Sequence, residues 1–323
     1  MSSEKTAVIS ALFANGIIAL MKFYGASVSG SASMWAEFKH SLGDWANGFF
    51  LLVGINQSSK EADSRFQFGH GKKAFFWTFI ASIGMLAIGG ALSIKGGIEK
   101  IMHPEPLESI GLNLWILGLS IIFESATLFK AMQSIILESY GRYTGISDLR
   151  NVFKALADAK PGTKFIFFED SAALAGLFIA LTAITVSHYS GHTVFDGVAS
   201  VIIGLMLFAI GFFSAKENMN LIMGESADPE LVCEVGDYTM GLPGVKDVHK
   251  VRSMVVGPAQ YLFHILVEAD PAMSLKELDE FEKNTALALK NQFQELTYLT
   301  ISTNPNDQIE DWKAKKIELS KKI

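Results

Sequence analysis

The feature that most constrains the fold of this chain is a set of long apolar segments. Three of them, residues 74–94, 171–195 and 197–215, contain no Asp, Glu, Lys or Arg. A fourth segment, residues 8–21, is interrupted only by the Lys22 that follows it, and two more, residues 34–55 and 110–129, contain a few charged residues. A helix needs roughly 20 apolar residues to cross a bilayer, and the chain is only 19% charged, against about 25% in soluble domains. The sequence therefore predicts a membrane protein with six transmembrane helices.

Basic residues predict the orientation of these helices. Lysines and arginines concentrate in the connections at 57–75 and 134–164, whereas the alternate connections contain one at most. The positive-inside rule places the basic loops, and with them both chain termini, on the cytoplasmic side. We expect the membrane to be the bacterial inner (plasma) membrane.

The composition changes after residue 215, where no further apolar span follows. The pattern predicts a helix at 229–240, strands at 246–256 and 260–269, a helix at 274–293 with a capping box, and a third strand at 296–303. This αββαβ order indicates a small α+β cytoplasmic domain. The sequence therefore predicts a transmembrane domain (1–215), a cytoplasmic domain (216–305) and a C-terminal tail (306–323). We expect the tail to be either a solvated helix or a frayed end of the chain.

Ionisable residues interrupt three of the predicted spans at similar depth. With a rise of about 1.5 Å per residue, His40 and Asp44 on the second helix lie roughly 12 and 18 Å below the outer face. The same rise places Glu124 on the fourth helix roughly 21 Å and Asp170 on the fifth roughly 22 Å below that face. Residues from three helices are thus expected at one level of the membrane.

Such groups are costly inside a bilayer unless they face one another or water. Carboxylates alone would repel each other, and either a bound divalent cation or partial protonation removes that repulsion. A His and an Asp four residues apart on a helix can offer a nitrogen and an oxygen to one ion. Hydrogen bonding between helices, without any metal, is the alternative explanation.

Several stretches resemble the cation diffusion facilitator family. The segments AEFKHSLGDWANGFFLLVG and RFQFGHGKKAFFW resemble its second span and following loop, FEDSAALAGLFIA its fifth span and VFDGVASVIIGLMLF its sixth. DVHKVRS and FHILVEAD resemble its cytoplasmic domain, and the GES sequence at 224–226 suggests the branch of the zinc transporter 9 type. The resemblance implies a ferredoxin-like cytoplasmic domain, a homodimer, and export of a divalent metal in exchange for protons.

The resemblance also implies which residues bind the transported metal: His40, Asp44 and Asp170. The family usually has another His or Asp four residues before Asp170, but here that position is Ile166. Glu124, by its depth, and Glu169, by its position beside Asp170, are the candidates for the fourth ligand or for a proton site. Zinc is the first expectation for the cargo, with iron or manganese as alternatives.

Two accessory metal sites are implied, each with a reduced ligand set. In the loop after the second helix the matching residues are Asp63 and His70. Phe66 stands where the family often has a His. In the cytoplasmic domain the matching residues are His249 and His264. Ser302 and Asn304 occupy the positions where bacterial zinc members have His and Asp. Ordinary structural histidines are the alternative in the cytoplasmic domain.

The predicted function is a secondary transporter, a divalent cation/proton antiporter working by alternating access, and not an enzyme. Metal ligands must lose protons before they bind, and imidazole titrates near neutral pH. The alternatives are an intramembrane metalloenzyme, disfavoured because there is no HExxH motif, and a metal sensor that does not transport. The expected partners are the metal ion, protons, the bilayer and a second copy of the chain, with no prosthetic group and no nucleic acid.

Overall fold

The computed structural model describes residues 3–156, 159 and 161–320. These residues form two compact units, one from residues 1–52 and 79–216 and the other from residues 53–78 and 217–323. We call them the membrane unit and the C-terminal unit. The helical elements up to residue 223 are α1 (Ser3–Ser29), α2 (Ala32–Ser58), α3 (Lys73–Gly84), the π-helix η1 (Met85–Ala91), α4 (Leu92–Met102), α5 (Ile110–Tyr140), η2 (Ile146–Asn151), α6 (Val152–Ala155), α7 (Pro161–Ser190) and α8 (Val194–Met223).

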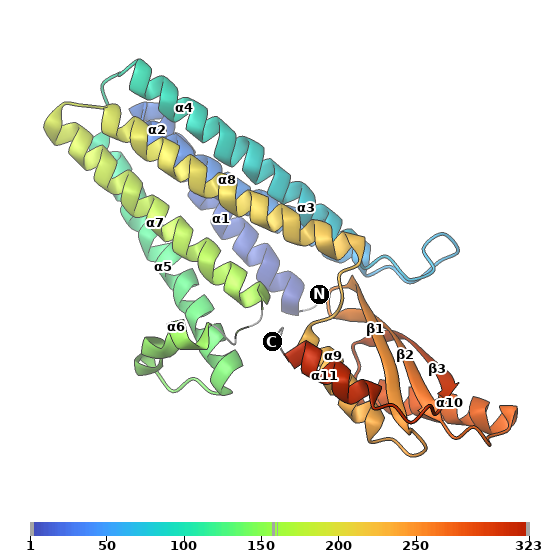
Figure 1. Ribbon diagram of the computed structural model, residues 1–323. Coiled ribbons are helices and arrows are strands. Elements are labelled where there is room, and N and C mark those ends of the chain that lie inside the picture. The colour runs from blue at the N-terminus through green and yellow to red at the C-terminus, as the bar shows by residue number, and fades with distance from the viewer. Residues whose placement is uncertain (1–2, 157–158, 160, 321–323) are drawn as a thin grey trace. The chain divides into compact units, whose positions relative to one another are not determined.

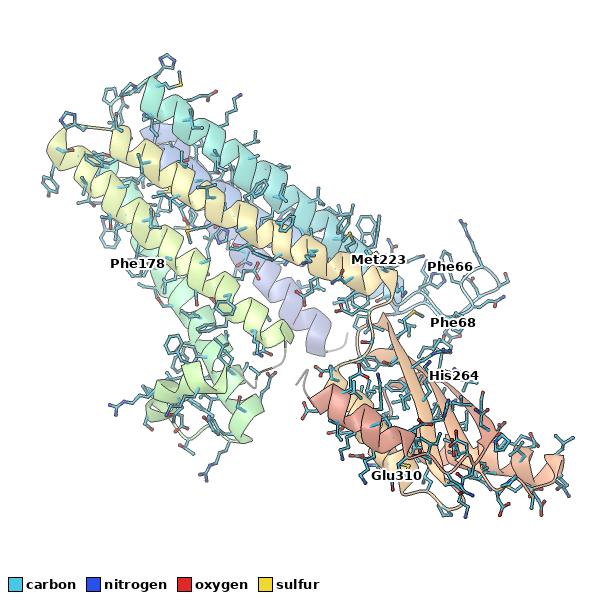
Figure 2. All side chains as sticks on the ribbon, viewed as in Figure 1. Phe66, Phe68, Phe178, Met223, His264 and Glu310 are labelled. Carbon is cyan, nitrogen blue, oxygen red and sulfur yellow. The ribbon has the colours of Figure 1, made fainter. Side chains whose placement is uncertain are left out.

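Within the described residues, five helical segments are long and apolar enough to cross a membrane: α1, the continuous segment α3–η1–α4, α5, α7 and α8. The sixth long helix, α2, has three charged residues, Glu37, Lys39 and Asp44, in its central part. Apolar rings such as Phe178 of α7, half exposed, cover the outside of the helices (Figure 2). The predicted helical membrane region is confirmed with five strongly apolar helical segments, and the more polar helix α2 carries two of the candidate metal ligands, His40 and Asp44.

Glycines bring α4 and α8 into direct backbone contact, and the two helices run side by side (Figure 1). A Cβ atom added at Gly97 would lie 2.6 Å from the carbonyl oxygen of Gly197, and one at Gly204 would lie 2.8 Å from the nitrogen of Ile94. Small residues allow this approach in membranes, where close van der Waals packing holds helices together. We call these contacts the glycine seam.

The C-terminal domain has the predicted αββαβ order, which confirms the expected fold class. Its elements are α9 (Pro229–Met240), β1 (Asp247–Gly257), β2 (Gln260–Ala269), α10 (Leu275–Gln292) and β3 (Leu296–Pro305). β1 pairs with β2 antiparallel, and β2 pairs with β3 parallel. The capping box predicted at Ser274 and Glu277 forms at the start of α10. Phe263 and Ile265 of β2 are fully buried in the core between sheet and helices.

A further helix, α11 (Asp311–Ser320), lies in the segment expected to be a solvated or frayed tail. Trp312 is only 4% exposed and belongs to the core of the domain. Its indole nitrogen donates a 3.0 Å hydrogen bond to Asp237 of α9, and its ring fills the space left by Gly236. Trp312 near the start of α11 and Leu319 near its end, both in the core, thus pack this helix against the domain.

Candidate functional site

A cavity of 590 Å³ in the membrane unit is lined by polar residues of several helices. Its polar lining comes from four helices: Asn15 of α1, His40, Asp44 and Asn47 of α2, Glu124, Thr127 and Lys130 of α5, and Glu169 and Asp170 of α7. The spacing of the three α2 residues places them on one helical face. The structure therefore brings together the five residues that the sequence suggested for the transport site and its possible fourth ligand.

His40 is the most enclosed of these residues. Its side chain is 3% exposed, and Nε2 lies 3.7 Å from Oδ2 of Asp44, beyond hydrogen-bond distance. Neither ring nitrogen has a hydrogen-bond partner among the described residues. Buried polar atoms are normally satisfied, so an imidazole left free beside a carboxylate is suited to coordinate a cation.

The carboxylates form one electrostatic cluster. The charge of Asp170 interacts with those of Glu124, Asp44 and His40, and the charge of Glu169 with those of Asp44, Asp170 and Glu124. Asp44 is 23% exposed, so solvent in the cavity reaches it. Carboxylate oxygens with an imidazole nitrogen are ligands for divalent zinc, manganese or iron.

The structure also bears on the fourth ligand. Ile166 is 51% exposed and does not line the cavity. Glu124 does line it, and the hydrogen bond found for its carboxylate among the described residues is a long one, 3.4 Å, from Thr127 of the same helix. Glu169 lines the cavity as well, although it lies about 100° around α7 from Asp170. Both glutamates are therefore available to an ion or a proton.

Sequence reasoning missed a buried ion pair next to His40. Lys22 of α1 lies 2.9 Å from Glu37 of α2, and neither side chain is more than 1% exposed. Glu37 and His40 line a common space of 10 Å³ against Gly176 of α7. The signals were present in the sequence, because Lys22 interrupts an apolar span and Glu37 is in helical phase with His40.

The start of α2 is fixed by a residue of α8. Asp196 is fully buried and accepts hydrogen bonds from the backbone nitrogen of Ala32 at 2.6 Å, the hydroxyl of Ser31 at 2.7 Å and both groups of Ser33. A carboxylate at a helix N-terminus satisfies free N–H groups there and interacts favourably with the helix dipole. Asp196 thereby anchors the helix that carries His40 and Asp44.

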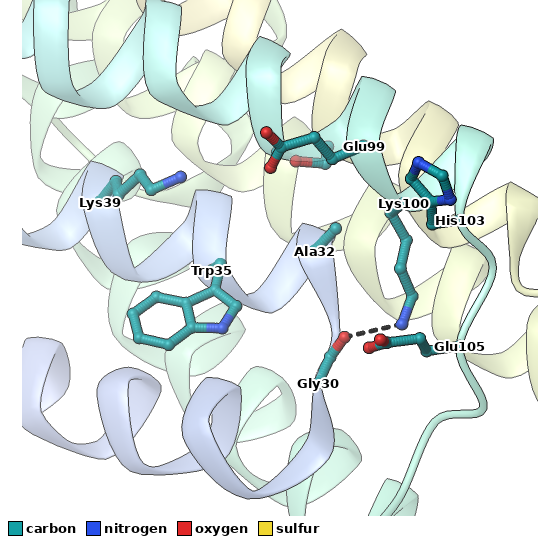
Figure 3. Close-up of a pocket in the computed structure, with 10 residues that line it drawn as sticks. Gly30, Ala32, Trp35, Lys39, Glu99, Lys100, His103 and Glu105 are labelled. Carbon is teal, nitrogen blue, oxygen red and sulfur yellow. Dashed lines mark hydrogen bonds between the residues drawn. The ribbon is translucent and has the colours of Figure 1, made fainter.

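A second pocket, of 550 Å³, lies on another face of α2 and has a different character (Figure 3). Two ammonium groups line it, and each already donates to a backbone carbonyl: Lys39 to Leu92 at 3.1 Å and Lys100 to Gly30 at 3.0 Å. Two carboxylates, Glu99 and Glu105, also line this pocket, so its positive and negative groups are equal in number, whereas the cavity around His40 has four carboxylates and one ammonium group. The cavity around His40 is therefore the better candidate for the metal.

The loop residues Asp63 and His70 are in contact, with Nε2 of His70 2.9 Å from the Asp63 carboxylate. Hydrogen bonds from the backbone of Phe66, the His70 ring and the backbone of Arg65 lower the pKa of Asp63. The Phe66 ring packs on His70, with ring centroids 4.5 Å apart. Phe68 contacts Tyr298 of β3 edge-on, so one aromatic ring of the loop touches the sheet within the C-terminal unit.

The two histidines proposed for the C-terminal domain lie apart. His249 of β1 lies beside three carboxylates, Glu268, Asp307 and Asp311. His264 of β2 instead pairs with the hydroxyl of Ser302 at 3.1 Å. His264 and Glu268 are four residues apart on one strand, about 13 Å, so a single ion does not bridge the two histidines.

Comparison with known proteins gives two family matches that together cover most of the chain. Residues 8–223 match the cation efflux transmembrane domain, and residues 227–306 match the cytoplasmic domain of cation efflux proteins. Similar proteins include the mitochondrial proton-coupled zinc antiporter SLC30A9 of Xenopus laevis, at 30% identity over 84% of this chain and 47% of that protein, and of Homo sapiens, at 30% over 81% and 45%. The manganese efflux system protein MneP of Bacillus subtilis is 24% identical over 94% of this chain and 96% of its own length.

These relatives correct one expectation. The chain spans about half the length of the SLC30A9 relatives it matches, and those relatives are named as mitochondrial proteins. This finding overturns the expected bacterial inner membrane with cytoplasmic termini. The positive-inside rule reads only the relative placement of basic loops, and it does not distinguish one organelle or organism from another.

Proposed function

Because the chain belongs to the cation efflux family, we propose that it is a secondary transporter that moves a divalent metal cation through the membrane in exchange for protons. The observation that carries the proposal is the cavity in which His40, with two free ring nitrogens, faces Asp44, Asp170, Glu124 and Glu169. The names of the similar proteins support zinc as the cargo and manganese as the alternative.

His40, Asp44 and Asp170 are the proposed ligands of the transported ion. An ion bound by an imidazole nitrogen and two carboxylate oxygens requires those groups to be deprotonated, so binding releases protons and acid promotes metal release. If the cavity opens to each side of the membrane in turn, this competition couples metal movement to proton movement in the opposite direction. Glu124 or Glu169 completes the coordination shell or accepts the exchanged proton.

We further propose a mitochondrial location and a homodimer that associates through the C-terminal domain. The location rests on the names of the SLC30A9 relatives, and the dimer on the match of residues 227–306 to the cytoplasmic domain of the family.

The loop residues Asp63 and His70 were the second candidate metal site. The Phe66 ring packs against the His70 imidazole, so we propose that the Asp63–His70 pair stabilises the loop and does not bind metal.

The decisive experiment is transport by the purified protein in sealed proteoliposomes that contain a zinc-sensitive dye and a pH-sensitive dye. We expect zinc entry with opposite proton movement for the wild type and for the control Glu99→Gln, whose side chain is 61% exposed on α4. Asp44→Ala and Asp170→Ala should each abolish both signals while dimerisation stays near normal. Zinc binding without transport would indicate a sensor instead, and near-wild-type uptake by either variant would exclude the assigned site.

A further inference from the structure

Four segments of the C-terminal unit converge on one cluster of potential metal ligands. His249 comes from β1, Glu268 from β2, Asp307 from the segment after β3, and Asp311 from the first turn of α11. One ligand atom of each lies within 4.8 Å of those of the other three. We propose that these residues form a divalent-cation site that fastens α11 to the sheet, separate from the transport site.

The charges of the cluster favour a cation. His249 Nδ1 lies 2.5 Å from Oδ2 of Asp311 and 3.6 Å from Oε1 of Glu268. Among the described residues, the ion pairs of Glu268 and Asp311 both go to this one imidazole. Asp247 adds a further carboxylate, which accepts a 2.6 Å hydrogen bond from the backbone of Asp311. Even a protonated imidazole leaves several negative charges together.

The burial of Glu268 makes this excess of negative charge costly. Its side chain is only 1% exposed, and one of its oxygens accepts a 3.2 Å hydrogen bond from the backbone of Asp307. Buried carboxylates in proteins are paired or coordinate metals. A divalent ion at the centre of the cluster would neutralise Glu268, Asp307 and Asp311 together.

The ligand set and its dimensions fit a first-row divalent metal such as zinc or manganese. One imidazole nitrogen and three carboxylate oxygens suit both ions. Around an ion with bonds of about 2.1 Å, opposite ligands lie about 4.2 Å apart. The separations of up to 4.8 Å in the cluster therefore close with small rotations of the side chains.

The position of the cluster defines what the ion would do. Asp307 and Asp311 lie beyond residue 306, where the match to the family's cytoplasmic domain ends. Trp312 holds the adjacent turn of α11 in the core through Asp237. An ion bound by Asp311 adds a second, metal-dependent attachment at the start of α11, so that metal in the surrounding solution controls how firmly the helix is held.

The test is hydrogen–deuterium exchange on the full-length protein in detergent, with zinc or manganese alone as the ligand. Asp44→Asn with Asp170→Asn provides a background without the transport site. We expect metal at about ten times its Kd to slow exchange in residues 311–319 about tenfold in that background. The response should disappear when Asp311→Asn is added, and the bound metal should fall by one ion per chain. His264→Asn is the matched control, and it should keep both the exchange response and the bound ion.

A second variant covers the case in which Asp311→Asn loosens α11 without metal. Asp307→Asn keeps the side-chain oxygen that accepts a 2.8 Å bond from Ile309, so it removes charge with little change in the local turn. Loss of one bound ion in Asp307→Asn supports the proposal. The proposal is overturned if the number of bound ions per chain is unchanged in these variants, or if metal slows exchange in them as much as in the background. Neither result depends on whether the protein transports metal.

Discussion

Lys22 of α1 donates a 2.9 Å hydrogen bond to Glu37 of α2, and both side chains are buried within the membrane unit. Glu37 shares a small space with His40. The ion pair therefore links α1 to the helix that carries two of the proposed metal ligands.

Removing one member of this pair should be worse than removing both. Lys22→Met leaves the Glu37 carboxylate buried without its cation, and we expect a loss of about 3–5 kcal/mol in stability. Lys22→Met combined with Glu37→Met should recover most of that loss, since apolar pairs often replace buried ion pairs without penalty. Thermal unfolding in one detergent measures both variants, and equal stability of the single and double variants would contradict the expectation.

Glu124 should be part of the proton coupling. The number of protons released on metal binding sets the slope of log Kd against pH. Glu124→Gln keeps size and polarity but removes one titrating group, so the slope should fall by up to about one proton. Glu169→Gln is the matched comparison on α7. Zinc titrations at several pH values measure this slope. If log Kd of Glu124→Gln changes with pH as it does in the wild type, Glu124 has no part in the mechanism.

Asp196 should be essential to the stability of α2. Asp196→Ala leaves the backbone nitrogen of Ala32 and the groups of Ser31 and Ser33 without their acceptor. Each buried donor left unsatisfied costs about 1–3 kcal/mol, and we expect a total loss of about 3 kcal/mol or more. Asp196→Asn retains one acceptor oxygen and should lose less. Unfolding midpoints in this order, wild type above Asn above Ala, are the expected result.

The loop around Asp63 should loosen in acid. The pKa of Asp63 is lowered by hydrogen bonds from Phe66, His70 and Arg65, so its folded-state value lies below the ordinary value of about 3.9. These bonds stabilise the loop above that value and are lost as the pH falls through the folded-state pKa. Protection factors for residues 63–70 should be higher in the wild type than in Asp63→Asn at neutral pH and should converge once the pH falls below the folded-state pKa of Asp63.

Ser64→Ala is the control for this loop, because it changes an exposed neighbour of Asp63 and leaves the carboxylate in place. It should follow the wild type at every pH. A difference between the wild type and Asp63→Asn that persists unchanged in acid would show that the charge of Asp63 does not hold the loop.

The cavity around His40 could be predicted in part because membrane depth depends only on the helical rise and the position of each span. This reasoning placed His40, Asp44, Glu124 and Asp170 at one level, and the structure places them around one cavity. Depth does not give the rotation of a helix. For that reason the sequence left open whether Glu169 faces the same cavity, and it did not identify Lys130 as part of the lining.

Contacts between segments distant in the sequence could not be predicted either. The cluster around His249 depends on how the chain turns after β3 and on where Trp312 packs α11. A charged stretch with a single aromatic residue is typical of a solvated tail. Local pattern predicted the strands and the capping box well, because alternation and caps involve residues only a few positions apart.

The glycine seam has a mechanical consequence. At Gly97 and Gly204 a single added carbon would lie within 2.6 to 2.8 Å of backbone atoms on the facing helix, so not even a methyl group fits between the two helices there. A shift of one helix along the other would bring larger side chains into these places, and we therefore expect α4 and α8 to move as one body. In the proposed transport cycle, the displacement that opens the cavity around His40 to the opposite side of the membrane would then involve the helices that line it, α1, α2, α5 and α7.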